Sequence, residues 1–75
     1  MEIDLVKIKK LRKGKKISLE EMAIYLGYKT ATGYYYAESG RCKFKPTHIP
    51  MLAEKLEVAM NDLFLSDGFA KMANI

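Results

Sequence analysis

Between Ser18 and Gly40, apolar residues recur at the three- and four-residue spacing of an α-helix, and a polar break divides them into two groups. The first group forms one apolar face: Leu19, Met22, Ala23 and Leu26. Ser18 and Glu21 have the spacing of a capping box, in which each side chain satisfies a free backbone N–H at the helix start. Gly27 suits the left-handed conformation that ends helices. The pattern predicts a helix from Leu19 to Leu26.

The second group predicts another short helix, which begins after Thr30 as its N-cap and stops at Gly40. Tyr34 and Ala37 are three residues apart, so both should face inward. The exposed face then carries Thr32, Tyr35 and Tyr36. Gly33 costs about 1 kcal/mol relative to alanine inside a helix, so either a neighbour must approach its backbone closely or the helix must be held by its neighbours. Two helices joined by the tight break at residues 27–30 form a helix-turn-helix.

A first helix is predicted before this unit, from Asp4 to Lys13, and Gly14 closes it. Its inner stripe consists of Leu5, Ile8 and Leu11. Ile17 precedes the Ser18 cap and could act as a hydrophobic staple. Because the connection is short, the first two helices must pack against each other.

Two helices are predicted after the unit. Pro50 is tolerated only in a first turn, which fixes the start of the helix Ile49–Glu57 near Thr47 or His48. A short fifth helix follows from Met60 to Leu65. The pattern therefore predicts an all-α, compact five-helix bundle over residues 1–65. Residues 66–75 form a C-terminal tail that has room for one more turn after Ser66, where Phe69 and Met72 would need burial.

The charge of the chain is distributed unevenly. The net charge is +4, but residues 1–45 hold 11 Lys and Arg against 5 acids, whereas residues 46–75 hold 2 against 4. The basic charge thus belongs to the part that contains the helix-turn-helix. Such asymmetry favours a polyanionic partner, although a solvated lysine-rich face would give the same pattern.

The remaining residues exclude several kinds of site. With 75 residues there is room for one domain. Cys42 is the only cysteine and His48 the only histidine, so we expect no disulfide, no metal, no cofactor and no enzymatic activity. No apolar run reaches the roughly 20 residues of a membrane span. We expect a cytoplasmic protein without a small-molecule ligand. The loop RCKFKPT adds three cations and Phe44, for which a role as core plug is favoured over base stacking.

These elements together resemble a known family. The run IxxLRxxxxISLEEMAxxLG, then a helix ending in AESG, a basic loop, IPMLAEKLEV and NDLF resembles the DNA-binding domain of the lambdoid phage repressor and Cro class, the XRE family. The resemblance covers about Ile8 to Phe64 and implies a phage or bacterial regulator of transcription, most often a repressor. It also implies that the second helix crosses the DNA backbone and the third enters the major groove, in a homodimer on double-stranded DNA.

The resemblance further implies roles for individual residues. Arg12 and Glu38 are expected to form a structural ion pair. Thr32 and Tyr36, with Tyr35 beside them, occupy base-reading positions, and the remaining DNA contacts are expected from Ser18, Lys29, Thr30, Arg41, Lys43 and Lys45, with Lys15 or Lys16 as further phosphate contacts. Ala37 replaces a larger apolar residue, so Tyr34 or another core residue must fill that space. Glu57 replaces a helix-ending glycine, which should strain that turn.

A different class of function is also compatible with the pattern. Tyrosines are enriched at protein contact surfaces, so the face with Tyr35 and Tyr36 could bind protein instead of DNA. The chain would then be a protein-interaction module, such as an antitoxin-like or anti-repressor protein.

Overall fold

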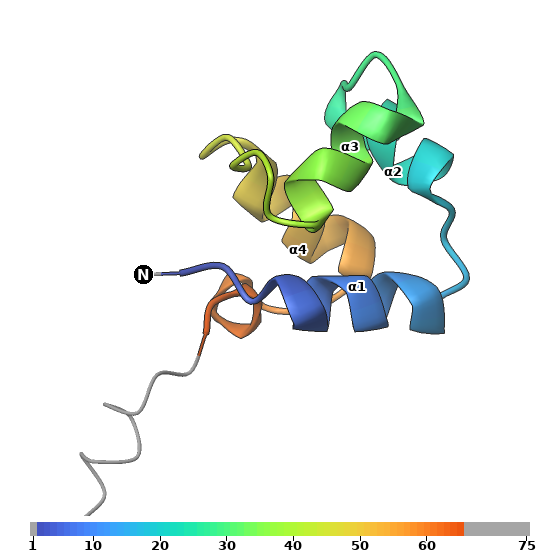
Figure 1. Ribbon diagram of the computed structural model, residues 1–75. Coiled ribbons are helices and arrows are strands. Elements are labelled where there is room, and N and C mark those ends of the chain that lie inside the picture. Colours follow the sequence, from blue (N-terminus) through green and yellow to red (C-terminus); the bar gives the residue numbers. More distant parts are fainter. Residues whose placement is uncertain (1, 66–75) are drawn as a thin grey trace, which may run out of the picture.

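The helices predicted from the sequence fold against one another around one core. The computed structural model describes residues 2–65, which contain four α-helices and one short 3-10 helix (Figure 1). The α-helices are α1 (Leu5–Gly14), α2 (Leu19–Leu26), α3 (Ala31–Glu38) and α4 (His48–Leu56). The expected fifth helix, from Met60 to Leu65, is not an α-helix: residues Met60–Leu63 form a short 3-10 helix, η1. The expected tail turn, with Phe69 and Met72, lies outside the described residues.

The helix starts are fixed by short polar side chains. Asp4 Oδ1 accepts a hydrogen bond from the backbone N–H of Lys7 at 3.0 Å, at the start of α1. Ser18 Oγ accepts from the N–H of Glu21 at 3.0 Å, at the start of α2. The other half of the expected capping box is wrong, because the Glu21 carboxylate accepts instead from Lys55 Nζ of α4 at 3.0 Å. This exchange ties α2 to α4.

The helix ends depend on residues with positive φ. Gly27 and Gly40 adopt φ values of 90° and 92°, as expected for glycines that stop helices. α4 ends at Glu57 with φ 60°, the strained turn expected where a glycine is missing. At the end of α1, however, Gly14 is still helical, and the chain turns at Lys16 with φ 59°. The closure assigned to Gly14 thus falls two residues later, on a lysine.

The core contains the apolar faces of all five elements. α1 lies against α3, α4 and η1 but not against α2, so the expected packing of the first two helices on each other is wrong. The largest fully buried side chains of the core are Ile8, Met22, Tyr34, Leu52, Leu56 and Leu63. Burying an aliphatic side chain of this size contributes roughly 1.5–3 kcal/mol. Ile17, 9% exposed, belongs to the same cluster as Met22, five residues on, which agrees with the expected staple.

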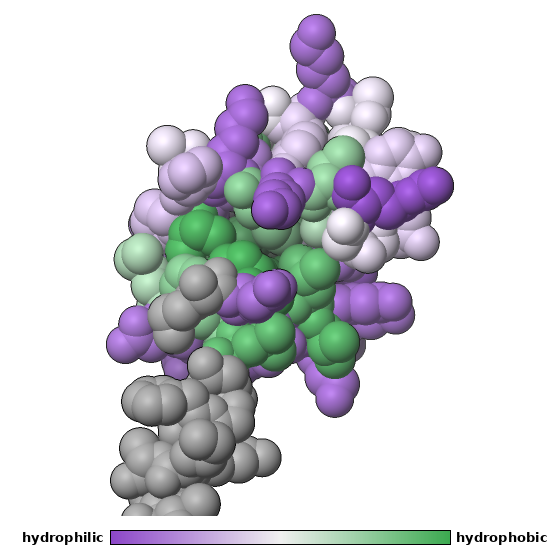
Figure 2. All heavy atoms as spheres, turned by 60° about the vertical axis from the view of Figure 1, so that its left-hand side comes forward, coloured by the Kyte–Doolittle hydropathy of each residue, from purple (hydrophilic) through white to green (hydrophobic). Residues whose placement is uncertain are grey.

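The ends of the described chain lie side by side. The Asp4 N–H donates to the carbonyl of Leu63 and the Leu65 N–H to that of Glu2, both at 2.7 Å. A cleft of about 330 Å³ opens between this N-terminal segment and the loop after α3, and it is lined by Glu2, Ile3, Leu5, Ala37, Gly40, Cys42, Lys43 and Phe44. The space beside Ala37 is therefore left partly open rather than filled as expected. Figure 2 shows apolar side chains in the middle of this side, ringed by hydrophilic ones.

Candidate nucleic-acid interface

α2 and α3 pack closely because the turn between them folds back on both helices. The Tyr28 N–H donates to the carbonyl of Ala23 at 2.8 Å, so the turn is hydrogen-bonded to the end of α2. The Tyr28 ring then lies on α3: a Cβ on Gly33 would stand 3.3 Å from Tyr28 Cδ1. The expected close approach at Gly33 is confirmed. Thr30 caps α3, since its Oγ1 accepts from the Gly33 N–H at 3.1 Å.

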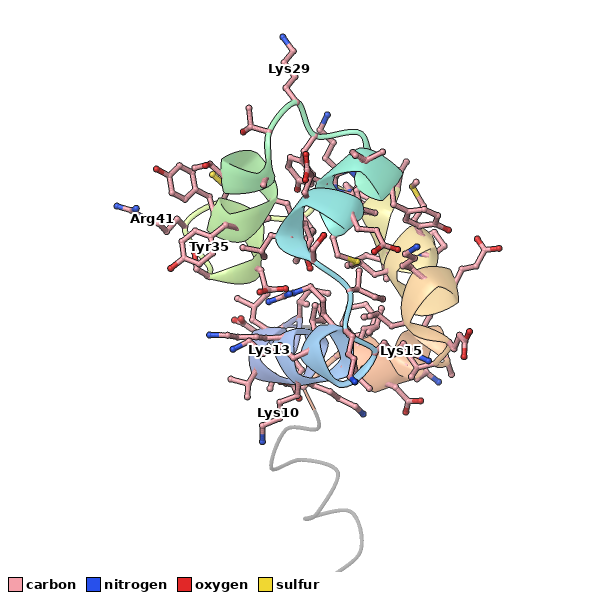
Figure 3. The ribbon with its side chains drawn as sticks, turned by 90° about the vertical axis from the view of Figure 1, so that its right-hand side faces the viewer. Lys10, Lys13, Lys15, Lys29, Tyr35 and Arg41 are labelled. Carbon is pink, nitrogen blue, oxygen red and sulfur yellow. The ribbon has the colours of Figure 1, made fainter. Side chains whose placement is uncertain are left out.

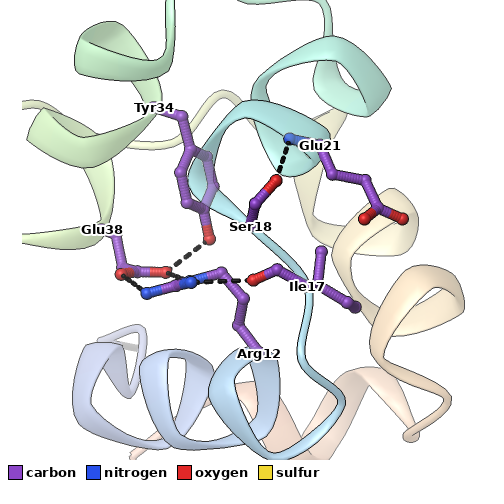
Figure 4. Close-up of polar contacts among 6 residues, drawn as sticks. All are labelled: Arg12, Ile17, Ser18, Glu21, Tyr34 and Glu38. Carbon is purple, nitrogen blue, oxygen red and sulfur yellow. Dashed lines mark hydrogen bonds and ion pairs between the residues drawn. The ribbon is translucent and has the colours of Figure 1, made fainter.

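A buried polar network joins α3 to α1 (Figure 4). Arg12 Nε and Nη2 donate to the two carboxylate oxygens of Glu38 at 2.8 and 3.1 Å, and Arg12 Nη1 donates to the carbonyl of Ile17 at 2.8 Å. Tyr34 Oη donates to Glu38 Oε2 at 2.8 Å. Burial, followed by the hydrogen bond with Glu38, raises the pKa of Tyr34 far above its ordinary value, so the hydroxyl stays protonated. Both ends of the ion pair are almost fully buried.

The outer face of α3 presents the side chains that the periodicity placed there. Thr32 is exposed, and the exposed fractions of Tyr35 and Tyr36 are 46% and 37%. Tyr34 and Ala37 are fully buried on the opposite side. The two outer tyrosine rings are 6.2 Å apart between centroids. The expected division of α3 into an inner and an outer face is therefore confirmed.

The loop after α3 is tied back to the helix it follows. The carbonyl of Tyr36 accepts from the N–H groups of Arg41 and Cys42 at 2.8 and 3.2 Å. The Arg41 guanidinium lies over the Tyr36 ring, 5.0 Å from its centroid. Phe44 is partly buried against Tyr34, with 5.9 Å between ring centroids, so its expected role as a core plug is confirmed.

His48 holds the far end of this loop. Its Nδ1 accepts from the Lys45 N–H at 3.4 Å, and the Tyr28 hydroxyl lies 3.4 Å from the same nitrogen. Because a backbone N–H can only donate, Nδ1 must be unprotonated in this arrangement. Burial, and then the charge of Lys45, lower the pKa of His48, which favours the same neutral form.

The cations of the described residues fall into two groups. Four are in ion pairs: Lys7 with Asp62, Arg12 with Glu38, Lys15 with Glu57 and Lys55 with Glu21. Within residues 2–65, no ion pair involves Lys9, Lys10, Lys13, Lys16, Lys29, Arg41, Lys43 or Lys45. Lys15 is thus the weaker of the two additional phosphate candidates, Lys15 and Lys16.

These free cations do not all lie together. In Figure 3, Lys29 extends from the α2–α3 turn, and Arg41 extends on the same side as Tyr35 of α3, whereas Lys10 extends from α1 away from α3. Lys43 and Lys45 are exposed in the loop after α3. The structure therefore places Lys29 before the start of α3 and Arg41 over its end, and leaves Lys10 apart from them. Lys43 lines the cleft beside the N-terminal segment, and Lys45 lies next to His48 at the start of α4.

The start of α2 is the least favourable part of the expected interface for an anion. Ser18 is exposed, but its Oγ already accepts from the Glu21 N–H. Glu20 is exposed in the first turn of the same helix, where its negative charge opposes a phosphate. A contact from Ser18 would therefore depend on its hydroxyl proton and on the free N–H groups of that turn.

Two arrangements in this region carry no signal in the sequence. The stacking of Arg41 on Tyr36 depends on the turn at Gly40, and the Lys45–His48 hydrogen bond depends on the way the loop enters α4.

Residues 2–65 contain no helix long and apolar enough to cross a membrane, and no cluster of three or more His, Cys, Asp or Glu side chains arranged to hold a metal ion. In comparisons with known proteins, no family model, no curated protein and no solved structure matches the chain.

Proposed function

We propose that residues 2–65 are a helix-turn-helix DNA-binding domain of the repressor and Cro type, which regulates transcription, most simply as a repressor. In this proposal α2 and α3 are the two helices of the motif, and α3 enters the major groove of double-stranded DNA. One observation carries the proposal: the exposed face of α3, with Thr32, Tyr35 and Tyr36, has cations without ion pairs at both of its ends.

The cations supply the affinity for any duplex. Lys29 before α3 and Lys43 and Lys45 after it are exposed and have no acidic partner within residues 2–65. Each lysine that neutralises a phosphate releases a condensed counterion, which lowers the slope of log K against log salt by about 0.9. Binding should therefore weaken steeply as salt rises.

The outer face of α3 supplies contacts with the bases. Thr32, Tyr35 and Tyr36 can donate single hydrogen bonds and touch thymine methyl groups. None of them forms the paired hydrogen bonds that arginine, asparagine or glutamine make with one base. Part of the specificity must then come from the shape of the DNA and from the spacing of two half-sites in a homodimer.

The buried network explains how so small a helix could keep its orientation. α3 spans Ala31–Glu38, and its last residue is held by Arg12 of α1 and by Tyr34. A recognition helix must be held at a fixed angle for its side chains to meet defined base edges. The Arg12–Glu38 pair is in this proposal a positioning element that does not touch DNA.

The test is a titration of the full chain against a fluorescent duplex of random sequence, at salt concentrations between about 50 and 200 mM. Affinity is expected to fall at least a hundredfold over this range. Lys43→Ala removes one lysine from each subunit of the proposed homodimer and should reduce the salt slope by about 2, whereas Lys55→Ala, which removes a cation paired with Glu21, should leave it unchanged. An affinity that does not respond to salt would contradict the proposal.

A second function is favoured by one observation. Tyr35 and Tyr36 are large side chains exposed next to each other on one helix, as at protein contact surfaces. A protein-interaction module of the antitoxin-like or anti-repressor kind would use this face. It predicts that Tyr36→Ala abolishes capture of a protein partner while the chain shows no salt-dependent affinity for duplex DNA.

A further inference from the structure

Few side chains of this chain can read a base pair by two hydrogen bonds from a rigid group. Arginine and lysine can read guanine by two hydrogen bonds, and asparagine and glutamine adenine, but only arginine holds two charged donors in one rigid plane, whereas lysine is a rotating point charge. The sequence contains two arginines, Arg12 and Arg41, two asparagines, Asn61 and Asn74, and no glutamine. Arg12 is buried in the ion pair with Glu38. Asn61 is in η1, which packs on α1 and α4, and Asn74 lies outside the described residues. Arg41 is thus the candidate that stands next to α3.

The position of Arg41 is fixed by its own backbone and by Tyr36. Its N–H donates to the carbonyl of Tyr36 at 2.8 Å, directly after the turn made by Gly40 with φ 92°. A Cβ on Gly40 would lie 3.3 Å from Leu5 Cδ1, so the turn is packed against α1 and disfavours any larger residue. The turn therefore returns Arg41 over the last part of α3 instead of leading it away.

The guanidinium of Arg41 contacts Tyr36 but keeps its hydrogen-bond donors free. It lies 5.0 Å from the centroid of the Tyr36 ring, an arrangement in which the ring face attracts the cation. No ion pair within residues 2–65 involves Arg41, and the residue is exposed. This contact uses the charge of the guanidinium, and within residues 2–65 no hydrogen bond uses its N–H groups, so they are free to donate. Figure 3 shows Arg41 extending from the molecule beside Tyr35.

From this geometry we infer that Arg41 reads a guanine in each half-site, donating to O6 and N7 in the major groove, and that Tyr36 positions its guanidinium. The inference rests on the proposed function and deepens it, because it names the base and the residue that recognises it. It replaces the phosphate contact that the sequence alone indicated for Arg41. A phosphate needs only the charge, whereas two hydrogen bonds to one guanine are favoured by the rigid fork of donors that arginine has and lysine lacks.

The test is a selection of bound sequences from a random duplex pool, made with the wild-type chain and with Arg41→Lys. Lysine keeps the charge but loses the fork. The wild type should enrich a guanine at one position of each half-site, and Arg41→Lys should lose that preference by roughly 5- to 150-fold. Affinity for random duplex should change by no more than about twofold, because the charge that contacts phosphates is kept.

Tyr36 is tested by a matched pair of variants. Tyr36→Phe keeps the ring face and should keep the guanine preference, whereas Tyr36→Leu should weaken it. Both variants lose the Tyr36 hydroxyl, so a change that they share at another position belongs to a base contact of that hydroxyl. Far-UV circular dichroism checks that both variants are folded. An equal loss at all positions of the site would show that Tyr36 acts through the fold, and would overturn its role as a positioning residue.

The outcomes also separate this inference from the proposed function. If the wild type enriches a symmetric site and Arg41→Lys selects the same site with the same preference, Arg41 is a phosphate contact and the inference is wrong, while the proposed function stands. If the wild type enriches no sequence and binds no duplex, the proposed function fails and the inference fails with it.

Discussion

Removing Arg12 should destabilise the fold more than removing any other cation of the described residues. In Arg12→Met, the Glu38 carboxylate stays almost fully buried and loses both hydrogen bonds from the guanidinium, keeping only the one from Tyr34 Oη. The carbonyl of Ile17 loses its partner as well. Breaking a buried ion pair from one side costs about 3–5 kcal/mol, because the remaining charge is left without compensation.

That loss is large for a chain of this size. A domain of 75 residues has a total stability of about 4–11 kcal/mol at 0.05–0.15 kcal/mol per residue. With about 4–8 °C for each kcal/mol, Arg12→Met should lower Tm by at least about 12 °C. In urea, with a slope of about 1 kcal/mol/M, the midpoint should fall by about 3 M or the variant should be unfolded without urea.

The assay is urea unfolding followed by far-UV circular dichroism, with two comparison variants. Lys15→Met breaks the ion pair with Glu57, whose atoms are a similar 3.0 Å apart but whose side chains are 35% and 75% exposed, so it should cost less than about 1 kcal/mol. Arg12→Met combined with Glu38→Gln removes the stranded charge and should recover part of the loss. A cost for Arg12→Met as small as that for Lys15→Met, or no recovery in the double variant, would refute the reasoning.

Three further predictions concern single positions. Burial lowers the pKa of His48, so as pH falls the unfolded chain binds a proton at this residue before the folded chain does. The stability that His48 contributes is therefore present above about pH 6.5 and is lost as pH falls through the lower folded pKa. In His48→Asn, unfolding midpoints measured from pH 7 to 5 should depend less on pH. In a Lys15→Met background, where the ion pair with Glu57 is already absent, Glu57→Gly should raise the free energy of unfolding by about 0.5–1 kcal/mol by relieving φ 60°, and an unchanged midpoint would contradict the strain. Gly14→Ala should stabilise α1 by up to about 1 kcal/mol, because no atom lies within 4 Å of a Cβ at this position. Gly33→Ala should not raise the stability, because a Cβ there meets Tyr28. Equal rises in Tm for the two variants would disprove the close approach of Tyr28 to Gly33.

Local patterns predicted the helices well because the signals that set them are local. Ser18 and Thr30 cap the helices that follow them, Gly27 and Gly40 end helices with positive φ, and Tyr34 turns inward. Each of these outcomes is decided by residues within one helical turn. The same holds for the exposure of Tyr35 and Tyr36, which follows once the buried face of α3 is known.

Of the features that sequence patterns could not predict, some depend on distant neighbours and others on the course of a single turn. The Glu21 carboxylate leaves its capping role for Lys55, which is 34 residues away in the chain. The turn after α1 falls on Lys16, although Gly14 is available, because the hydrogen bond from the Ile17 N–H to the Arg12 carbonyl closes it there. The Arg12–Glu38 pair spans 26 residues and was indicated only by the resemblance to a family. For the candidate interface, sequence patterns predicted which residues are exposed at α3 but not that Arg41 stacks on Tyr36.

The central claim is that the outer face of α3 and the loop after it face a DNA duplex. Titrating the ¹⁵N-labelled chain with the selected duplex, and following the backbone amides by NMR, tests it directly. The largest shifts are expected in residues 30–36 and 41–45, with little change in α4 and η1. Largest shifts in residues 58–65, or none at saturating duplex, would contradict the claim.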